Sequence, residues 1–83
     1  MSKFMSDLEK ALGIYRDMKM LIDICKSYEG YRDMWEISWD YFWEMSNDFP
    51  FKVDWYDTDT TYEEDIMSRY LAIEEFMEGF RVD

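Results

Sequence analysis

Carboxylates dominate the middle of this chain, and they are the residues there that could do chemistry. Between positions 33 and 68 the sequence holds eleven acids and one base, Lys52, for a net charge of −10. Such a density of carboxylates could bind a divalent cation, supply an acid–base pair, or present negative charge to a basic partner. The eleven acids are Asp33, Glu36, Asp40, Glu44, Asp48, Asp54, Asp57, Asp59, Glu63, Glu64 and Asp65.

Catalysis has little support among these residue types. The chain has no histidine, which removes the commonest general base, and its only cysteine, Cys25, falls on an apolar stripe. Three glycines are too few and too scattered for a phosphate-binding loop. Because acids are so abundant, no single carboxylate pair is informative. We therefore predict a non-enzymatic protein with no catalytic residues and no cofactor; a small enzyme is a minor alternative.

A metal site is the next use of clustered carboxylates. Asp57, Asp59 and Thr61 have the spacing of the first three ligands of an EF-hand loop. The match then fails, because Tyr62 stands where that loop needs glycine and Ser68 stands where it needs a bidentate glutamate. Weak Ca²⁺ or Mg²⁺ association with this segment stays open, but we predict no dedicated metal site.

Length and composition indicate one folded domain spanning residues 1–83. Apolar residues make up 48% of the chain and aromatic residues 20%, which argues against a disordered acidic tail. A single cysteine fits a reducing cytosol, and no secretory signal or membrane-spanning stretch is evident. A net charge of −11 disfavours direct binding to nucleic acid or to anionic membranes. We expect a cytoplasmic protein.

The pattern of apolar residues predicts an all-α, three-helix, bundle-like fold. We expect helices at about 6–28, 31–47 and 61–79, with an extended connector at 48–60. Ser6 and Glu9 have capping-box spacing, as do Thr60 with Glu63 and Thr61 with Glu64. Gly30 suits a left-handed stop after the first helix. We expect Phe51, Val53 and Trp55 to hold the connector against the core, whether residues 51–56 are strand or loop.

The second predicted helix has two contrasting faces. At about 100° per residue, Trp35 and Trp39 fall on the core side, while Asp33, Glu36, Asp40 and Glu44 fall on the opposite side. Tyr41 and Trp43 lie nearer the edges of the apolar stripe. For Trp43, core and interface are equally favoured, since aromatic residues are enriched at recognition surfaces.

Carboxylates one helical turn apart are spaced by about 5–6 Å. Phosphates along one DNA strand have a similar spacing of roughly 6–7 Å, consistent with the charge density of the duplex. In size and charge the chain resembles the small acidic DNA-mimic proteins that phages encode against restriction, CRISPR or other DNA-handling enzymes. This resemblance covers residues 33–68 and the overall composition, without an aligned motif. It implies an inhibitor whose acids occupy the cationic site of a basic nucleic-acid-binding protein.

On this hypothesis the partner-binding residues are the eleven acids, with Tyr41 and Trp43 as anchors. The competing interpretation is a helical adaptor or oligomerising module without nucleic-acid mimicry. The heptad-like apolar spacing of the first helix and the eight methionines suit a partner helix, and a homodimer stays open. Reversing the charges of Asp40 and Glu44 should weaken binding far more than reversing those of Asp7 and Glu9.

Overall fold

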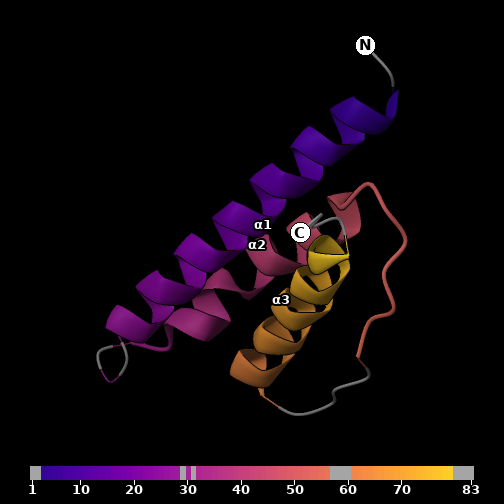
Figure 1. Ribbon diagram of the computed structural model, residues 1–83. Coiled ribbons are helices and arrows are strands. Elements are labelled where there is room, and N and C mark those ends of the chain that lie inside the picture. The colour runs from indigo at the N-terminus through magenta and orange to yellow at the C-terminus, as the bar shows by residue number, and fades with distance from the viewer. Residues whose placement is uncertain (1–2, 29, 31, 57–60, 80–83) are drawn as a thin grey trace.

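The computed structural model describes residues 3–28, 30, 32–56 and 61–79. Over these residues the chain forms three helices and no strand, which confirms the predicted all-α, three-helix fold (Figure 1). Helix α1 spans Lys3–Ser27, α2 spans Met34–Asp48 and α3 spans Tyr62–Glu78. Each helix packs against both of the others. Helix α2 runs back along α1 after a short turn and passes behind α1 and α3 in the view of Figure 1.

Helices α1 and α2 each start about three residues away from the predicted position. Helix α1 begins at Lys3, so Ser6 lies inside the helix and is not its cap. The ring of Phe4 lies 6.0 Å from that of Phe51, and this contact with the connector favours the added turn. Helix α2 begins at Met34, three residues later than expected, because Asp33 is its N-cap and accepts a hydrogen bond from the Glu36 N–H at 3.1 Å.

The start of α3 follows the predicted capping pattern. Thr61 is the N-cap, and its hydroxyl accepts a hydrogen bond from the Glu64 N–H at 3.1 Å. The competing pair of Thr60 with Glu63 lies partly outside the described residues. Gly30 has a φ of 90°, the left-handed conformation expected for it after α1.

The core lies where the apolar faces of the three helices meet. Trp35 and Phe42 of α2 are buried, as the periodicity predicts for Trp35, and Trp39 is half-buried. The largest completely buried side chains include Met18 and Phe42. The other buried apolar residues are Ala11, Ile14, Ile22, Cys25, Phe49, Ile66, Tyr70, Ala72, Ile73 and Met77.

The connector packs through phenylalanines. The ring of Phe51 lies 5.3 Å from that of Phe76 and 6.1 Å from that of Phe49, between the start of α1 and the end of α3. Val53 is also half-buried, and residues 51–56 form a loop with no strand. Trp55 departs from the prediction. It is 42% exposed, and the Arg69 guanidinium lies over its ring, 5.9 Å from the ring centroid.

Candidate functional site

The solvent-facing side of α2 carries a continuous set of acids and aromatic residues. At about 100° per residue, Glu36, Asp40 and Glu44 occupy its centre. Trp43 borders them on the side nearer α3. Ile37 and Tyr41 border them on the side nearer α1. We call this set the α2 outer face; its exposed members are Glu36, Ile37, Asp40, Tyr41, Trp43, Glu44, Asn47 and Asp48.

The acids of the α2 outer face form a regular row. Glu36, Asp40, Glu44 and Asp48 follow one another at four-residue steps, so their backbone positions advance by about 6 Å at each step. The row sits on a helix that contains no Lys or Arg. Within the described residues, none of the four makes a salt bridge. In the described part of the chain, the acids of the row therefore face solvent without an ion-pair partner.

Three apolar side chains lie beside this row and are open to solvent. Tyr41 is 66% exposed, Ile37 49% and Trp43 46%. Both predicted anchors, Tyr41 and Trp43, are therefore on the surface. For Trp43, which the sequence placed equally well in the core or at an interface, the structure shows an exposed side chain. Ile37 was missed by the sequence analysis. The sequence could have indicated its exposure, because Ile37 lies nearly opposite the core residue Trp35 on the helix.

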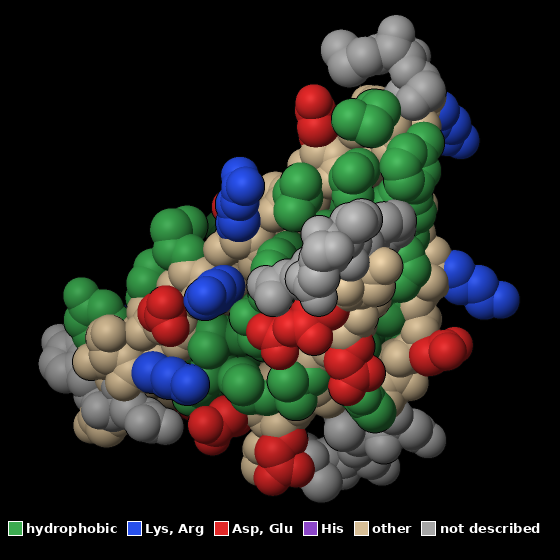
Figure 2. All heavy atoms as spheres, in the orientation of Figure 1, with side chains coloured by type: hydrophobic (Ala, Val, Ile, Leu, Met, Phe, Trp, Pro, Cys, Tyr) green, Lys and Arg blue, Asp and Glu red, His purple; other side chains and the backbone are tan. Residues whose placement is uncertain are grey.

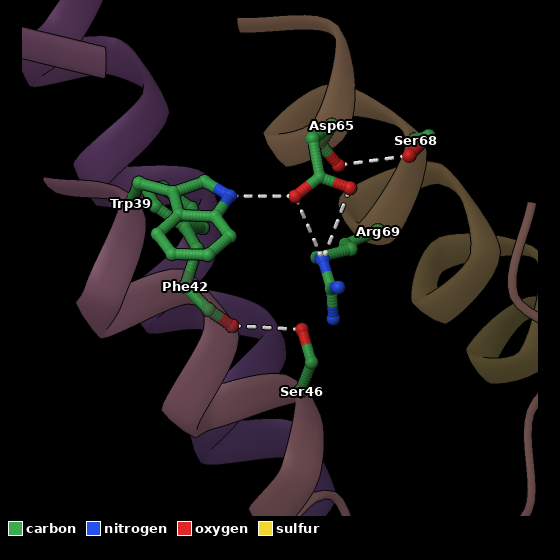
Figure 3. A network of polar contacts seen from close by, with 6 residues as sticks. All are labelled: Trp39, Phe42, Ser46, Asp65, Ser68 and Arg69. Atoms are coloured by element: carbon green, nitrogen blue, oxygen red, sulfur yellow. Dashed lines mark hydrogen bonds and ion pairs between the residues drawn. The ribbon is translucent and has the colours of Figure 1, made fainter. Parts of the chain in front are cut away.

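Asp65 is not a free surface acid, because side chains of α2 and α3 engage its carboxylate (Figure 3). The Trp39 indole Nε1 donates a hydrogen bond to Asp65 Oδ2 at 2.6 Å, and Arg69 Nε lies 3.3 Å from both carboxylate oxygens. The side chains of Asp65 and Arg69 are only 22% and 20% exposed. Asp65 therefore joins α2 to α3, and its contact with a partner stays a prediction that this engagement does not favour.

The other predicted acids fall into separate places. Asp33 is engaged in capping α2 and lies before the row. Asp54 is exposed on the connector, and Glu63 and Glu64 are exposed in the first turn of α3, where negative charge suits the helix dipole. Asp57 and Asp59 lie outside the described residues. The proposed second cluster is therefore described only in part.

Elsewhere on the described surface, acids lie among bases or accept hydrogen bonds from tyrosines. Helix α1 carries five bases and four acids, and both kinds are visible among apolar side chains on the face drawn in Figure 2. On α3, Glu74 Oε2 accepts hydrogen bonds from the hydroxyls of Tyr70 at 3.0 Å and Tyr15 at 3.3 Å. Glu75 accepts one from Tyr56 at 2.7 Å. Of the three helices, only α2 presents acids with no base.

Two tyrosines hold their protons more tightly than usual. Burial, followed by hydrogen bonding with Tyr15 and Glu74, raises the pKa of Tyr70 well above its ordinary value of 10.0. The hydrogen bond to Glu75 raises the pKa of Tyr56 in the same direction. Both hydroxyls are thus kept as neutral donors to carboxylates, which is a structural use of these groups.

The described residues contain no cluster of three or more potential metal ligands. Cys25 is buried, with its Sγ 3.6 Å from both the Met34 carbonyl oxygen and Ser38 Oγ. None of the described helices is long and apolar enough to cross a membrane. The α2 outer face, with its exposed acids and aromatic residues, is therefore the candidate site. The chain matches no protein-family model, no curated protein and no solved structure.

Proposed function

We propose that this protein is a non-enzymatic inhibitor that mimics nucleic acid. Its α2 outer face would occupy the cationic nucleic-acid-binding site of a basic protein in the cytosol. The observation that carries the proposal is the row of four exposed acids, on a helix without bases, that make no salt bridge with any described residue. Their step of about 6 Å approximates the spacing of phosphates along a DNA strand.

A rigid helix is well suited to present such a row of charges. A helix held by Trp35 and Phe42 in the core fixes the positions of its outer carboxylates, so little order has to be created on binding. Negative charge concentrated on one face accelerates association with a cationic site, and the effect falls as salt screens it. Tyr41 and Trp43 add apolar contact area beside the charge, as recognition hot spots commonly do.

The test is capture of nucleic-acid-binding proteins from a cell lysate on the immobilised protein, at low and at high salt. We expect capture at low salt and release by an excess of duplex DNA. The double variant Asp40→Lys/Glu44→Lys should lose capture. The matched control, Glu9→Lys/Asp23→Lys, reverses two exposed acids of α1 and should retain it. Equal loss in both variants, or capture that duplex DNA does not compete, would refute the mimicry.

A second candidate function is a helical adaptor or oligomerising module. It is favoured by the exposure of apolar side chains on α1, where Met20 is 55% and Ile24 38% exposed. Concentration-dependent light scattering discriminates between the two. A tight homo-oligomer that leaves the α2 outer face free would support the adaptor.

A further inference from the structure

An exposed apolar patch crosses the boundary between α1 and α2. The line of contact between these helices passes through Cys25 and Ser38, whose side chains lie 3.6 Å apart. The two helices run in opposite directions (Figure 1). At about 100° per residue, the residue before each contact residue therefore lies on the same side of that line. These two residues are Ile24 and Ile37, and both are exposed.

Helix α3 lies on the other side of the same contact line. Its Tyr70 stacks on Tyr15 of α1, with ring centroids 5.6 Å apart, and its Asp65 binds Trp39 of α2. The side that carries Ile24 and Ile37 is therefore the one that α3 leaves uncovered.

Each of these isoleucines has an exposed apolar neighbour one turn away on its own helix. Met20 precedes Ile24 by four residues, and Tyr41 follows Ile37 by four. We call these four residues, Met20, Ile24, Ile37 and Tyr41, the α1–α2 patch. Two parallel stripes of this kind are what a third helix packs against in a bundle. The patch thus offers a position equivalent to that of α3, on the opposite side of the α1–α2 pair.

The charges around the α1–α2 patch select the kind of helix that would fit. Along α2 the same exposed side continues into Glu44 and Asp48. Along α1 it continues into Asp17 and, farther from the patch, Lys10. Helix α2 supplies no base to this region. A helix seated here would need an apolar stripe over the patch and lysines or arginines toward α2.

The glycine at position 13 is a second, independent feature that favours a helix bound on this face. It lies on the stripe of α1 that contains Asp17, Met20 and Ile24, at successive spacings of four, three and four residues. Glycine is unfavourable in the middle of a helix, and a Cβ at this position would meet nothing within 4 Å. Among the residues that the structure describes, no packing therefore requires glycine at this position. A missing side chain on an open face permits close approach of another backbone.

We propose that the α1–α2 patch is the seat of a cationic amphipathic helix belonging to the partner protein. This inference rests on the proposed function, because it assigns the apolar part of the contact made by the same basic target. The acids of α2 attract the target, and the patch holds one of its helices.

The test uses a fluorescein-labelled helical peptide of 18 residues, with leucines at helical spacing and lysines elsewhere. A second peptide of the same composition has the leucines scattered around the helix. Anisotropy titrations at one salt concentration compare the two. We expect the amphipathic peptide to bind at least tenfold more tightly than the scattered one. Equal binding of both would overturn the proposal, since charge alone would then account for it.

Substitutions locate the binding to the α1–α2 patch. Ile24→Ser/Tyr41→Ser should weaken binding of the amphipathic peptide at least tenfold. Gly13→Leu should weaken it without a change in helix content by circular dichroism. The matched control is Leu71→Ser, at a leucine of α3 that is 43% exposed, and it should leave affinity within twofold. An equal loss in the control, or no loss in the patch variants, would contradict the assignment.

Two further results separate this inference from the proposed function. If the patch variants bind the peptide normally while Asp40→Lys/Glu44→Lys still loses DNA-competed capture, only the helix seat is wrong. If DNA does not compete capture but the patch variants lose the peptide, only the mimicry is wrong. Self-association in sedimentation velocity that the patch variants abolish would assign the patch to a second copy of this chain and overturn the partner helix.

Discussion

The indole nitrogen of Trp39 and the carboxylate of Asp65 are joined by a hydrogen bond of 2.6 Å that ties α2 to α3. Arg69 lies beside the same carboxylate, and its guanidinium covers Trp55 of the connector. One acid thus links two helices and, through Arg69, a loop. Its function is to hold the scaffold that presents the α2 outer face.

Trp39→Phe should destabilise the fold, because it removes the N–H donor and keeps most of the ring. Hydrogen bonds to charged groups contribute up to about 3 kcal/mol, and the partial exposure of Asp65 reduces this to about 1–2 kcal/mol. Urea unfolding measures the loss. Trp43→Phe is the matched control on the same helix and should stay within about 0.5 kcal/mol of the parent. Equal losses in the two variants would contradict a special contribution from Trp39.

Asp33 can be tested as a helix cap separately from its charge. Asp33→Ala should cost about 1 kcal/mol in the free energy of unfolding, because the Glu36 N–H loses its acceptor. Asp33→Asn should retain the stability, since asparagine caps helices as well as aspartate does. Chemical denaturation of both variants gives the comparison. If Asp33→Asn is as unstable as Asp33→Ala, the charge of Asp33 matters more than the cap.

Asp40→Lys should stabilise the protein at low salt while it weakens partner binding. The substitution removes two like-charge pairs at i,i+4, with Glu36 and Glu44, and creates two opposite-charge pairs. At about 0.2–0.5 kcal/mol per pair, the gain is roughly 1 kcal/mol. Thermal unfolding at low and high salt should show the gain shrinking as salt rises. A variant that binds less and is also less stable would indicate damage to the fold instead of loss of a binding charge.

We expect the folded protein to lose stability at alkaline pH because of Tyr70. Its pKa is raised in the folded state, mainly by burial, so the folded protein keeps this proton when the unfolded chain has released it. Stability is therefore fully present below the ordinary tyrosine pKa of about 10 and falls as pH rises above it. Thermal midpoints between pH 8 and 11 should decline less steeply in Tyr70→Phe. Tyr41→Phe, at a 66% exposed tyrosine, should decline as the parent does, and an unchanged slope in Tyr70→Phe would exclude this residue as the cause.

Much of the fold and the centre of the candidate site follow from local patterns. Three helices, the cap at Thr61, the burial of Trp35 and the exposure of Glu36, Asp40 and Glu44 all depend on residues within one or two turns of each other. Helical periodicity acts over that range, so the sequence carries the information directly.

The structure departs from these patterns where a distant residue decides the outcome. Asp65 reads as one more surface acid in a dense acidic segment, yet its partner Trp39 is 26 residues away. Ser6 has good capping spacing, yet a ring contact between Phe4 and Phe51 accompanies a helix that starts earlier. The alternation of apolar and polar residues predicts that Trp55 is buried, yet its side chain is exposed, with Arg69 over its ring.

The sequence by itself determined that this protein has a helical scaffold and one helix without a single positive charge, because charge and periodicity are local properties. Tertiary packing decided which acids remain free and which apolar side chains stay uncovered. Those outcomes depend on how the three helices meet, since Asp65 is engaged, and Ile24 and Ile37 are left open, by the side on which α3 packs.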